Sequence, residues 1–554
     1  MKTIYRILLS MLTGVLLWLA WPPAGFPFLS FFAFVPLFFV SDDLLKSKAK
    51  FQFWSGMKYA FIAFLIWNFA TTWWILNITI EGAIATFILN ALFMSIVFGF
   101  WQRFRALELP QAAAPLSFIA FWGSWEFLHL NWDITWPWLN LGNIFSSCTE
   151  YVQWYEFTGA FGGCLWILLA NFFIFFMLKN LKNNRRKCIT HAILAVLWIA
   201  LPMIGSLIRY NSYELPKADG RNSIEAVIVQ QNTDPVEEQY SMTNLEHAQR
   251  ILSVADTKIT PATQLVVCAE TAIPWPVKHD IVVSKDYPRF STGEIPQTYA
   301  AFPEIDTFVM RHPNLNLVIG LSTMKFYDHK ATLTAHKVEG MNRFIDSYNT
   351  SVCYTQKDSK QTYFKSKLVP GVEKMPYPKI FGFLEDLAID LGGTSGSLGN
   401  DTIQRVFSLS GTDIKIGVPI CYESAYGEHF GKFIQNGAQM MCVITNDGWW
   451  GNSPGHKQHF LLSKLRAVES RRSIMRAANT GISAFIDERG DTHQQTKYNT
   501  RLAIREKVCA NSDLTFYVQH GDYIARICVG LTALIFLFGL YWRIRKRSKK
   551  EATA

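Results

Sequence analysis

Residues 414–424 read Ile-Lys-Ile-Gly-Val-Pro-Ile-Cys-Tyr-Glu-Ser. The run Ile414–Ile420 is mostly apolar and rich in β-branched residues, which predicts a buried strand. Cys421 stands where this strand ends, and the polar residues after it predict a turn. A thiol at the tip of a strand is well placed to act as a nucleophile. This stretch therefore predicts an α/β domain with a reactive cysteine at the edge of a sheet.

The composition predicts an integral membrane protein around this domain. Of the 554 residues, 50% are hydrophobic, with 43 Phe and 19 Trp. Charged residues make up 17%, below the roughly 25% of a typical soluble domain. The formal net charge is +10, and outside the large hydrophilic segment the basic residues fall mainly in short loops between apolar segments and in the tail. This placement follows the positive-inside rule and gives no reason to expect a nucleic-acid partner.

Nine cysteines are scattered along the chain, and none has CxxC or zinc-like spacing. We therefore predict no metal, no cofactor and no disulfide framework. A single disulfide within the hydrophilic part of the chain remains an open alternative.

Eight segments are apolar enough and close enough to the ~20 residues of a spanning helix. The first resembles a signal peptide, but it has no clear cleavage site, so we expect a retained anchor. The eight predicted spans are Ile4–Ala20, Phe28–Val40, Tyr59–Leu76, Ala83–Trp101, Ala112–Leu130, Trp154–Leu178, Ile189–Ile208 and Tyr523–Trp542.

Lys and Arg occur in the connections that follow the second, fourth and sixth spans. The short connections that follow the first, third and fifth spans contain neither residue. Eight spans with both chain ends in the cytoplasm explain this pattern. The prediction is a membrane domain of seven spans over residues 1–208 and a large external domain over 209–522. The eighth span follows at 523–543, and a basic cytoplasmic tail closes the chain at 544–554. In a bacterium with two membranes the external domain would lie in the periplasm.

Short runs rich in Val and Ile punctuate the external domain and predict buried strands. A helix is predicted over His459–Ala478, with its arginines on the solvent side, and Phe383–Asp401 is expected to be a mobile surface loop. Mixed strands and helices imply an α/β or α+β layered fold. The predicted strands are Ile224–Val229, Leu265–Ala269, Leu315–Leu321, Thr350–Tyr354, Ile414–Ile420, Met440–Thr445 and Ile482–Ile486.

Three polar residues occur in positions that could build a site with one another. Glu270 and Cys421 each end a predicted strand, and Lys365 follows the aromatic pair Tyr363-Phe364. A carboxylate can remove the thiol proton, and a fixed ammonium can stabilise the oxyanion formed by attack on a carbonyl. Taken alone, each has a plainer interpretation: a core cysteine, a solvated glutamate and a surface lysine.

The local sequences around these residues resemble a known family. The strings are Glu270-Thr271-Ala272-Ile273-Pro274, Lys365 with Leu368-Val369-Pro370, Cys421-Tyr422-Glu423, and Asn446-Asp447-Gly448-Trp449-Trp450. In this order, and with these spans, the chain resembles the apolipoprotein N-acyltransferases, membrane members of the nitrilase (carbon-nitrogen hydrolase) superfamily. The resemblance implies an eight-span α-helical bundle and a nitrilase-like αββα sandwich.

The same resemblance implies a role for each residue. Glu270 corresponds to the general base, Lys365 to the oxyanion-stabilising lysine and Cys421 to the acyl-accepting nucleophile. The family's supporting or substrate-binding positions correspond to Glu373, Tyr422, Glu423, Asn349, Trp449 and Trp450. Where the family has a Trp after the first strand of this domain, the nearest aromatic residue here is Tyr240. For Trp450 and Asn349 plain packing is the simpler interpretation.

The function implied is transfer of an acyl chain from a phospholipid, with phosphatidylethanolamine as the expected donor, to the N-terminal amine of a diacylated lipoprotein. It proceeds through a thioester on Cys421, without metal or nucleotide, at the bacterial inner membrane. Two alternatives remain: a membrane-tethered amidase or nitrilase that uses the same three residues, and a lipid-binding or transport protein without catalysis. Glu126, inside the fifth span, is expected to form a buried hydrogen bond or to contact a lipid headgroup.

Overall fold

The computed structural model describes residues 1–23, 25–107, 113–218, 222–289, 291–292, 295–338, 340, 342–356, 360–381 and 397–551. Most of the predicted loop Phe383–Asp401 lies outside the described residues. The chain divides into two compact units. A helical unit comprises Met1–Ser212 and His520–Ala554, and a sheet-containing unit comprises Tyr213–Gln519.

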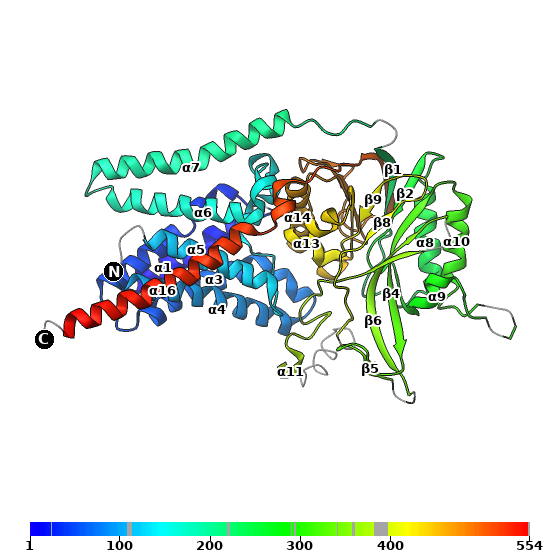
Figure 1. Cartoon of the computed structure of the whole chain (residues 1–554), viewed down its shortest axis with the longest axis horizontal. Coiled ribbons are helices and arrows are strands. Elements are labelled where there is room, and N and C mark those ends of the chain that lie inside the picture. The colour runs from blue at the N-terminus through cyan, green and yellow to red at the C-terminus, as the bar shows by residue number, and fades with distance from the viewer. Residues whose placement is uncertain are drawn as a thin grey trace. The chain divides into compact units, whose positions relative to one another are not determined.

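The helical unit is a bundle of long apolar helices (Figure 1). Short 3-10 turns, η1 (Pro27–Phe31) and η2 (Trp73–Asn77), precede α2 and follow α3. The helices are α1 (Thr3–Ala20), α2 (Val35–Lys46), α3 (Gln52–Thr72), α4 (Ile80–Arg105), α5 (Ala113–Asn131), α6 (Tyr155–Asn180), α7 (Arg185–Ser212) and α16 (Tyr523–Glu551).

A helix occupies each of the eight predicted positions, but the predicted number of spans is not confirmed. Among the described residues, seven helices are long and apolar enough to cross a membrane, and α5 is not one of them. The 19 residues of α5 include Glu126 and His129, which lower its mean hydropathy. The second predicted span, Phe28–Val40, is too short: η1 and α2 together continue to Lys46.

The interior of the bundle is packed with aromatic side chains. Trp67, Trp122 and Trp166 are almost fully buried, and the rings of Phe38 and Phe172 stack with centroids 4.3 Å apart. Such rings bury large areas and add a geometric preference to their contacts. At the edge of the bundle α7 packs along α6 and leaves most of its apolar side chains exposed, as expected for a helix that faces lipid (Figure 1).

Glu126 lies inside this bundle and is 5% exposed. Its Oε1 accepts hydrogen bonds from Trp122 Nε1 at 3.0 Å and from the amide of Leu141 at 2.9 Å. The prediction that Glu126 forms a buried hydrogen bond is therefore correct. Its bond to Leu141 also joins α5 to the segment that follows this helix.

The other unit contains two sheets. The larger has the strand order β14-β1-β2-β4-β6-β5, with β3 also paired to β4 and β7 to β6. Its strands are β1 (Ser223–Gln230), β2 (Thr263–Val267), β3 (Ile273–Lys278), β4 (Asn316–Tyr327), β5 (His336–Lys337), β6 (Phe344–Tyr354), β7 (Gln361–Phe364) and β14 (Leu502–Cys509).

The second sheet has the order β13-β12-β11-β10-β9-β8. The strands are β8 (Val406–Ser408), β9 (Lys415–Gly417), β10 (Met440–Thr445), β11 (Ile474–Ala478), β12 (Ala484–Ile486) and β13 (Thr492–His493). β9, β10 and β11 run parallel, so the residues that follow β9 and β10 emerge at the same edge.

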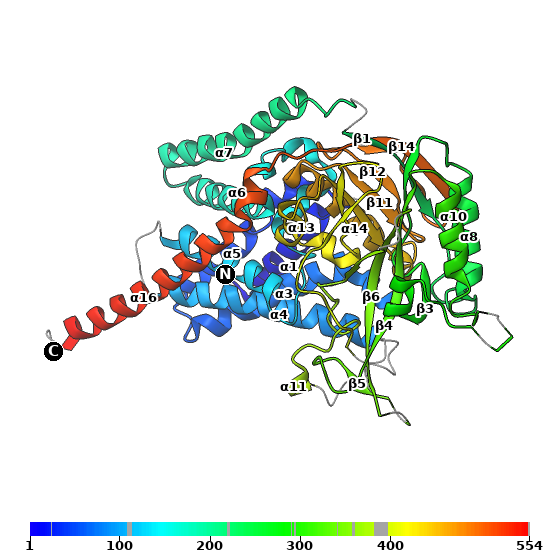
Figure 2. The ribbon, with the colours of Figure 1, turned by 45° about the vertical axis from the view of Figure 1, so that its right-hand side comes forward.

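Helices cover the outer faces of the two sheets, which makes the predicted αββα sandwich. Alternate residues of β1 point to opposite faces: Ile224 and Ile228 pack between the sheets, whereas Val227 and Val229 pack under α8 (Asn244–Asp256) and α10 (Ala301–Arg311). Figure 2 shows α8 and α10 on one side of the sheet that contains β4 and β6. On the other side α13 (Gly427–Gln435) and α14 (Pro454–Ser470) pack against the second sheet.

The helix predicted over His459–Ala478 is wrong in its second half. α14 ends at Ser470 because Arg471 adopts a left-handed conformation (φ +49°), and the chain then forms β11. The arginines expected on the solvent side are buried: Arg466, Arg472 and Arg476 are at most 2% exposed. The amphipathic pattern was misleading because both the helix and the strand that follows it are enclosed by the sandwich.

Candidate active site

Cys421 occupies a sharp turn between strand and helix. It follows β9 and opens the 3-10 helix η6 (Cys421–Ala425), and Ile420 just before it forms an isolated bridge with Ile444 of β10. Its φ of +50° lies in the left-handed region, which costs a non-glycine residue of order 1–3 kcal/mol. The side chain is nearly buried, at 8% exposure. The surrounding contacts hold this residue in a conformation that it would not adopt by preference.

Lys365 follows β7 and lies between two carboxylates. Its Nζ is 3.0 Å from Oε1 of Glu270 and 2.8 Å from Oε1 of Glu373. Asn349, on β6, donates from Nδ2 to the same two oxygens, at 2.7 Å and 3.3 Å. The other oxygen of Glu270 accepts a hydrogen bond from the amide of Asn446, which follows β10. Glu270, Lys365, Glu373 and Asn349 are thus brought together, and an amide from the second sheet joins them.

The charges of this cluster act on Cys421. Burial raises the pKa of the Cys421 thiol, the Glu270 carboxylate raises it further and the Lys365 ammonium lowers it. The resulting pKa lies well above the usual value for a thiol. Burial lowers the pKa of Lys365, but Glu270 and Glu373 outweigh burial and raise it. The resting site therefore holds an ammonium ion and a neutral thiol that feels both charges.

Glu423 joins the lysine segment to the cysteine turn. Its Oε2 accepts from the amide of Ile420 at 2.7 Å, and its Oε1 accepts from the amide of Ser366 at 2.7 Å and from the hydroxyl of Tyr363 at 2.5 Å. His429 Nε2 lies 3.2 Å from Oε1. Burial raises the pKa of Glu423, but these donors outweigh burial and lower it to about 2. Glu423 positions the neighbours of Cys421 and Lys365, and its bonding capacity is filled by protein groups.

A second buried network supports the cysteine turn from behind. Asp447 Oδ1 is 2.9 Å from His459 Nδ1, and His459 Nε2 is 3.1 Å from the carbonyl oxygen of Cys421 and 3.0 Å from Ser424 Oγ. Arg476 donates to Asp447 Oδ2 at 2.7 Å. The network therefore links the ends of β9 and β10 with α14 and β11.

Among the described residues, one group of side chains has metal-ligand spacing: the ligand atoms of Cys421, Asp447 and His459 lie within 4.8 Å of one another. Both oxygens of Asp447 are already hydrogen-bonded, and the Arg476 guanidinium beside them repels a divalent cation. The geometry favours a hydrogen-bonded support for the cysteine over a metal centre.

Comparison with protein-family models identifies both parts of the chain. Residues 226–506, more than half of the chain, match the carbon-nitrogen hydrolase family. The chain belongs to this family. Residues 13–173 match the N-terminal domain of apolipoprotein N-acyltransferase.

Curated relatives extend the similarity over the whole chain and confirm the predicted resemblance. The apolipoprotein N-acyltransferase of Chlorobaculum tepidum is 26% identical over 549 residues, which cover 97% of each chain. That of Thermotoga maritima is 36% identical over 182 residues, 32% of this chain and 34% of the relative. Among solved structures, Nit3 of Saccharomyces cerevisiae, a member of branch 10 of the nitrilase superfamily, matches 53% of this chain and 93% of its own, with 18% identity and a TM-score of 0.36.

Tyr240 lies in the loop after β1, where the resemblance led us to expect a tryptophan. Tyr240 is 50% exposed, and its ring meets Trp275 edge to face with centroids 5.6 Å apart. The adjacent Gln239 accepts from Asn446 Nδ2 at 3.2 Å. Since the amide of Asn446 binds Glu270, this loop is connected to the carboxylate cluster through one residue.

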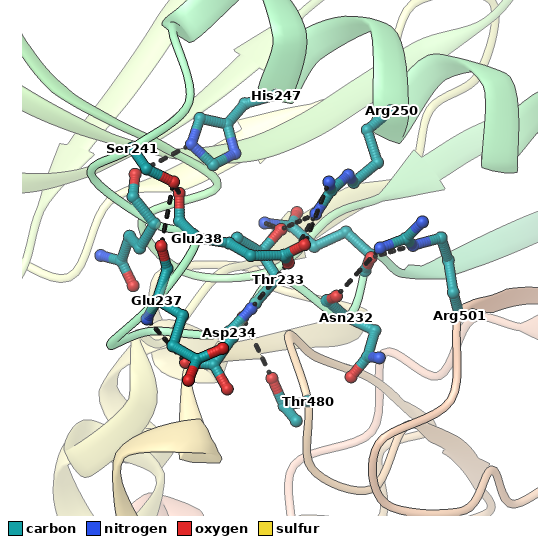
Figure 3. Close-up of polar contacts among 12 residues, drawn as sticks. Asn232, Thr233, Asp234, Glu237, Glu238, Ser241, His247, Arg250, Thr480 and Arg501 are labelled. Atoms are coloured by element: carbon teal, nitrogen blue, oxygen red, sulfur yellow. Dashed lines mark hydrogen bonds and ion pairs between the residues drawn. The ribbon is translucent and has the colours of Figure 1, made fainter.

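Polar contacts hold the same loop in place (Figure 3). Arg250 of α8 pairs with Glu238 at 2.8 Å, and Asp234 Oδ1 accepts from the amides of Val236 and Glu237. Arg501 donates to the carbonyl of Gln231 at 3.0 Å. Tyr240 is therefore presented by an ordered loop.

The remaining predicted residues surround the turn without joining the carboxylate cluster. Tyr422 is buried and meets Tyr426 edge to face at 5.2 Å. Trp449 is 39% exposed, whereas the ring of Trp450 packs on His459 at 5.4 Å. Packing is thus the observed environment of Tyr422 and Trp450, and Trp449 has a free face.

Sequence reasoning did not assign the network of Asp447, His459 and Arg476. Asp447 lies in the string Asn446–Trp450, of which only the two tryptophans were given a role, and His459 was predicted only as the first residue of a helix. Arg476 was expected in solvent. An arginine within the apolar run Ile474–Ala478 was the available indication, because a buried guanidinium needs an anionic partner nearby.

Proposed function

We propose that this membrane enzyme is an apolipoprotein N-acyltransferase. It transfers an acyl chain from a phospholipid to the N-terminal amine of an S-diacylglyceryl-cysteine on a lipoprotein. One observation supports this assignment most strongly: a buried lysine shared by two carboxylates acts electrostatically on a strained cysteine, in a chain with a membrane-spanning bundle.

In the first half-reaction the thiol proton of Cys421 moves to Glu270 as Sγ attacks the ester carbonyl carbon of the phospholipid. The ammonium of Lys365 stabilises the tetrahedral oxyanion. Collapse of this intermediate breaks the ester C–O bond. The lysophospholipid oxygen takes the proton from Glu270, and a thioester remains on Cys421.

In the second half-reaction the lipoprotein amine attacks the thioester carbon and gives a proton to Glu270. Collapse of the second oxyanion breaks the C–S bond, and the returning thiolate is protonated by Glu270. The products are an amide on the lipoprotein and the free enzyme. This two-step, ping-pong route needs no metal or nucleotide.

Glu373 holds the Lys365 ammonium in position during both steps. A lysine between two carboxylates retains one anionic partner when Glu270 becomes protonated, so the ammonium stays charged and oriented. Asn349 bridges the same oxygens and fixes their separation.

The donor we propose is phosphatidylethanolamine, at the bacterial inner membrane, with the catalytic domain in the periplasm. The exposed aromatic residues Trp449, Tyr240 and Trp275 are candidates for the lipid-contacting wall. A membrane bundle supplies both lipid substrates at high local concentration, and a soluble domain would not.

The first half-reaction is tested by intact mass. Purified protein incubated with phosphatidylethanolamine is expected to gain the mass of one acyl chain, which is removed by neutral hydroxylamine. Cys421→Ala is expected to gain none. Product formation by wild-type protein without any adduct at early times would exclude the thioester route.

The second half-reaction separates a transferase from a hydrolase. Addition of a synthetic diacylated lipopeptide is expected to move the chain from the adduct to the peptide amine. Release of free fatty acid at the same rate with or without the peptide would favour the membrane-tethered amidase-type hydrolase instead.

A further inference from the structure

We propose that the helical unit binds an anionic phospholipid in a cavity at the basic end of the bundle. The cavity lies among α2, α4, α5 and α6 and has a volume of about 240 Å³. Its lining residues are Leu45, Trp101, Phe104, Arg105, Ala113, Ala114, Phe172, Phe175, Phe176 and Lys179. None of these residues belongs to the carbon-nitrogen hydrolase domain, so the proposal stands apart from the acyl-transfer mechanism.

Two cations and one carboxylate give this cavity an excess of positive charge. Asp42 binds both cations, with Oδ1 2.5 Å from Arg105 and Oδ2 2.5 Å from Lys179. One carboxylate cannot neutralise two cations, so the three side chains carry a net charge of +1. Arg105 and Lys179 retain N–H groups beyond those that bind Asp42, and these can donate to a phosphate oxygen.

The rest of the cavity wall is apolar and mostly aromatic. The Arg105 guanidinium lies over the ring of Trp101, 4.8 Å from its centroid, and the Lys179 ammonium lies 5.5 Å from the centroid of Phe175. Phe104, Phe172 and Phe176 add further apolar surface to the cavity wall. A ligand that fits must combine an anionic head with a hydrocarbon chain.

The position of the cavity also favours a lipid. The same end of the bundle carries the Met1 ammonium and Arg6, both bound to Asp43, the neighbour of Asp42. Positively charged ends of membrane bundles face the anionic surface of the cytoplasmic leaflet, and basic pockets between helices bind lipid headgroups there. With a net +1 site, a headgroup of net charge −1 such as phosphatidylglycerol is preferred to a zwitterionic one.

Native mass spectrometry of the full-length protein tests this inference. Delipidated protein in detergent is mixed with equal amounts of phosphatidylglycerol and phosphatidylethanolamine of the same chain length. One phosphatidylglycerol is expected to be retained in preference to phosphatidylethanolamine. Arg105→Gln with Lys179→Gln is expected to lower this retention roughly tenfold or more, because two charge-assisted contacts are lost.

Two variants act as control and safeguard. Arg103→Gln with Lys182→Gln removes the same charge from exposed residues on the same two stretches of chain and is expected to leave retention unchanged. Because the first variant leaves Asp42 unpaired, Ala114→Leu provides an independent test: it fills the cavity and leaves its charges in place.

Loss of phosphatidylglycerol in Ala114→Leu, with a monodisperse protein and an unchanged melting temperature, supports the cavity. Equal retention of the two lipids by wild-type protein, full retention in Ala114→Leu, or equal loss in Arg103→Gln with Lys182→Gln would each overturn the proposal. Acyl transfer is measured separately, so failure of lipid binding and failure of the proposed function are distinguishable.

Discussion

Glu270 and Lys365 shift the pKa of the Cys421 thiol in opposite directions. Substitution of either residue is therefore expected to change the reactivity of the thiol in opposite directions. Because the thiol pKa lies well above its usual value of about 9, alkylation by neutral iodoacetamide is expected to rise roughly tenfold per pH unit between about pH 6 and pH 9. Glu270→Gln removes the anion that raises this pKa, so alkylation is expected to be faster at each pH. Lys365→Met removes the cation that lowers it and is expected to slow the reaction.

Peptide-resolved mass spectrometry measures this rate at Cys421, with partly exposed Cys509 of the same domain as the internal control. In the same preparations both variants are expected to lose acyl transfer, since the proposed base or the proposed oxyanion partner is gone. An alkylation rate at Cys421 that falls in Glu270→Gln would contradict the assigned electrostatics.

Glu423 is predicted to stabilise the fold in a pH-dependent manner. Its pKa of about 2 in the folded protein lies below the ordinary 4.5, so the stabilisation is complete above about pH 4.5 and is lost as the pH falls toward 2. This difference corresponds to roughly 3 kcal/mol. Glu423→Gln is expected to lower the melting temperature at pH 7, with much less further loss on acidification than the wild type.

Tryptophan fluorescence at a series of pH values between 2 and 7 follows this transition. Glu237→Gln, an exposed carboxyl group of the same domain, serves as the matched control. Identical acid dependence in wild type and Glu423→Gln would show that other groups dominate.

Helix α14 acts on the proposed nucleophile through His459, which contacts the Cys421 carbonyl and Asp447. His459→Ala removes these buried hydrogen bonds and is expected to slow thioester formation roughly 10- to 100-fold. The acyl-donor concentration at half-maximal rate should change little, because His459 holds the turn and not the lipid. His459→Gln, which can donate to the same carbonyl, is expected to restore part of the rate.

His456 supplies a control from the same helix. It is also buried, and it packs on Tyr498 and hydrogen-bonds to Asn452. His456→Ala therefore tests general loosening of α14. If both alanine variants slow the reaction equally, His459 has no specific positioning role.

Strands formed by long, mostly apolar runs were predictable, and short strands of mixed composition were missed. Met440–Thr445 is an apolar run that ends in Thr445, Ile224–Val229 is apolar apart from Glu225, and β10 and β1 lie there. β7 and β8 are short and mixed in composition, so neither alternation nor a long apolar run marks them. β11 was missed because Arg476 was interpreted as a residue on the polar face of a helix. Its actual partner, Asp447, is 29 residues away in the sequence, so no local pattern indicates the contact.

The candidate cluster could be predicted as a set of residues but not as a geometry. The resemblance placed Glu270, Lys365, Glu373 and Asn349 together, and these four are in hydrogen-bond contact. The left-handed conformation of Cys421 and the link through Asn446 depend on how two sheets pack, which no local pattern encodes.

The number of membrane crossings decides the topology of the whole chain, because an odd number would place the two termini on opposite sides. Within the helical unit, α5 runs antiparallel to α4: Trp101 Nε1 donates to the Ala114 carbonyl near the basic end, and Asn90 meets His129 at 3.1 Å toward the other end. α5 therefore runs alongside α4 from Trp101 to Asn90, and α4 is apolar enough to span.

The C-terminal helix returns to the basic end. Along α16, Thr532 meets Ser124 of α5, Phe536 stacks on Phe121, and Gly539 lies against Phe104 at the end of α4. Figure 1 marks both chain ends on that side of the helical unit. These contacts favour eight crossings, with Met1 and the basic tail on one side of the membrane.

We therefore expect a fluorescent protein fused at either terminus to mature in the cytoplasm, where such reporters fold. An alkaline phosphatase inserted at the exposed turn of Leu333 in the sheet-containing unit is expected to be active, since that enzyme requires the oxidising periplasm. Cysteine labelling from outside intact cells gives an independent measure at the same positions. A fluorescent fusion at one terminus and a dark fusion at the other would mean that the number of crossings is odd, and α5 would then be the helix that fails to cross.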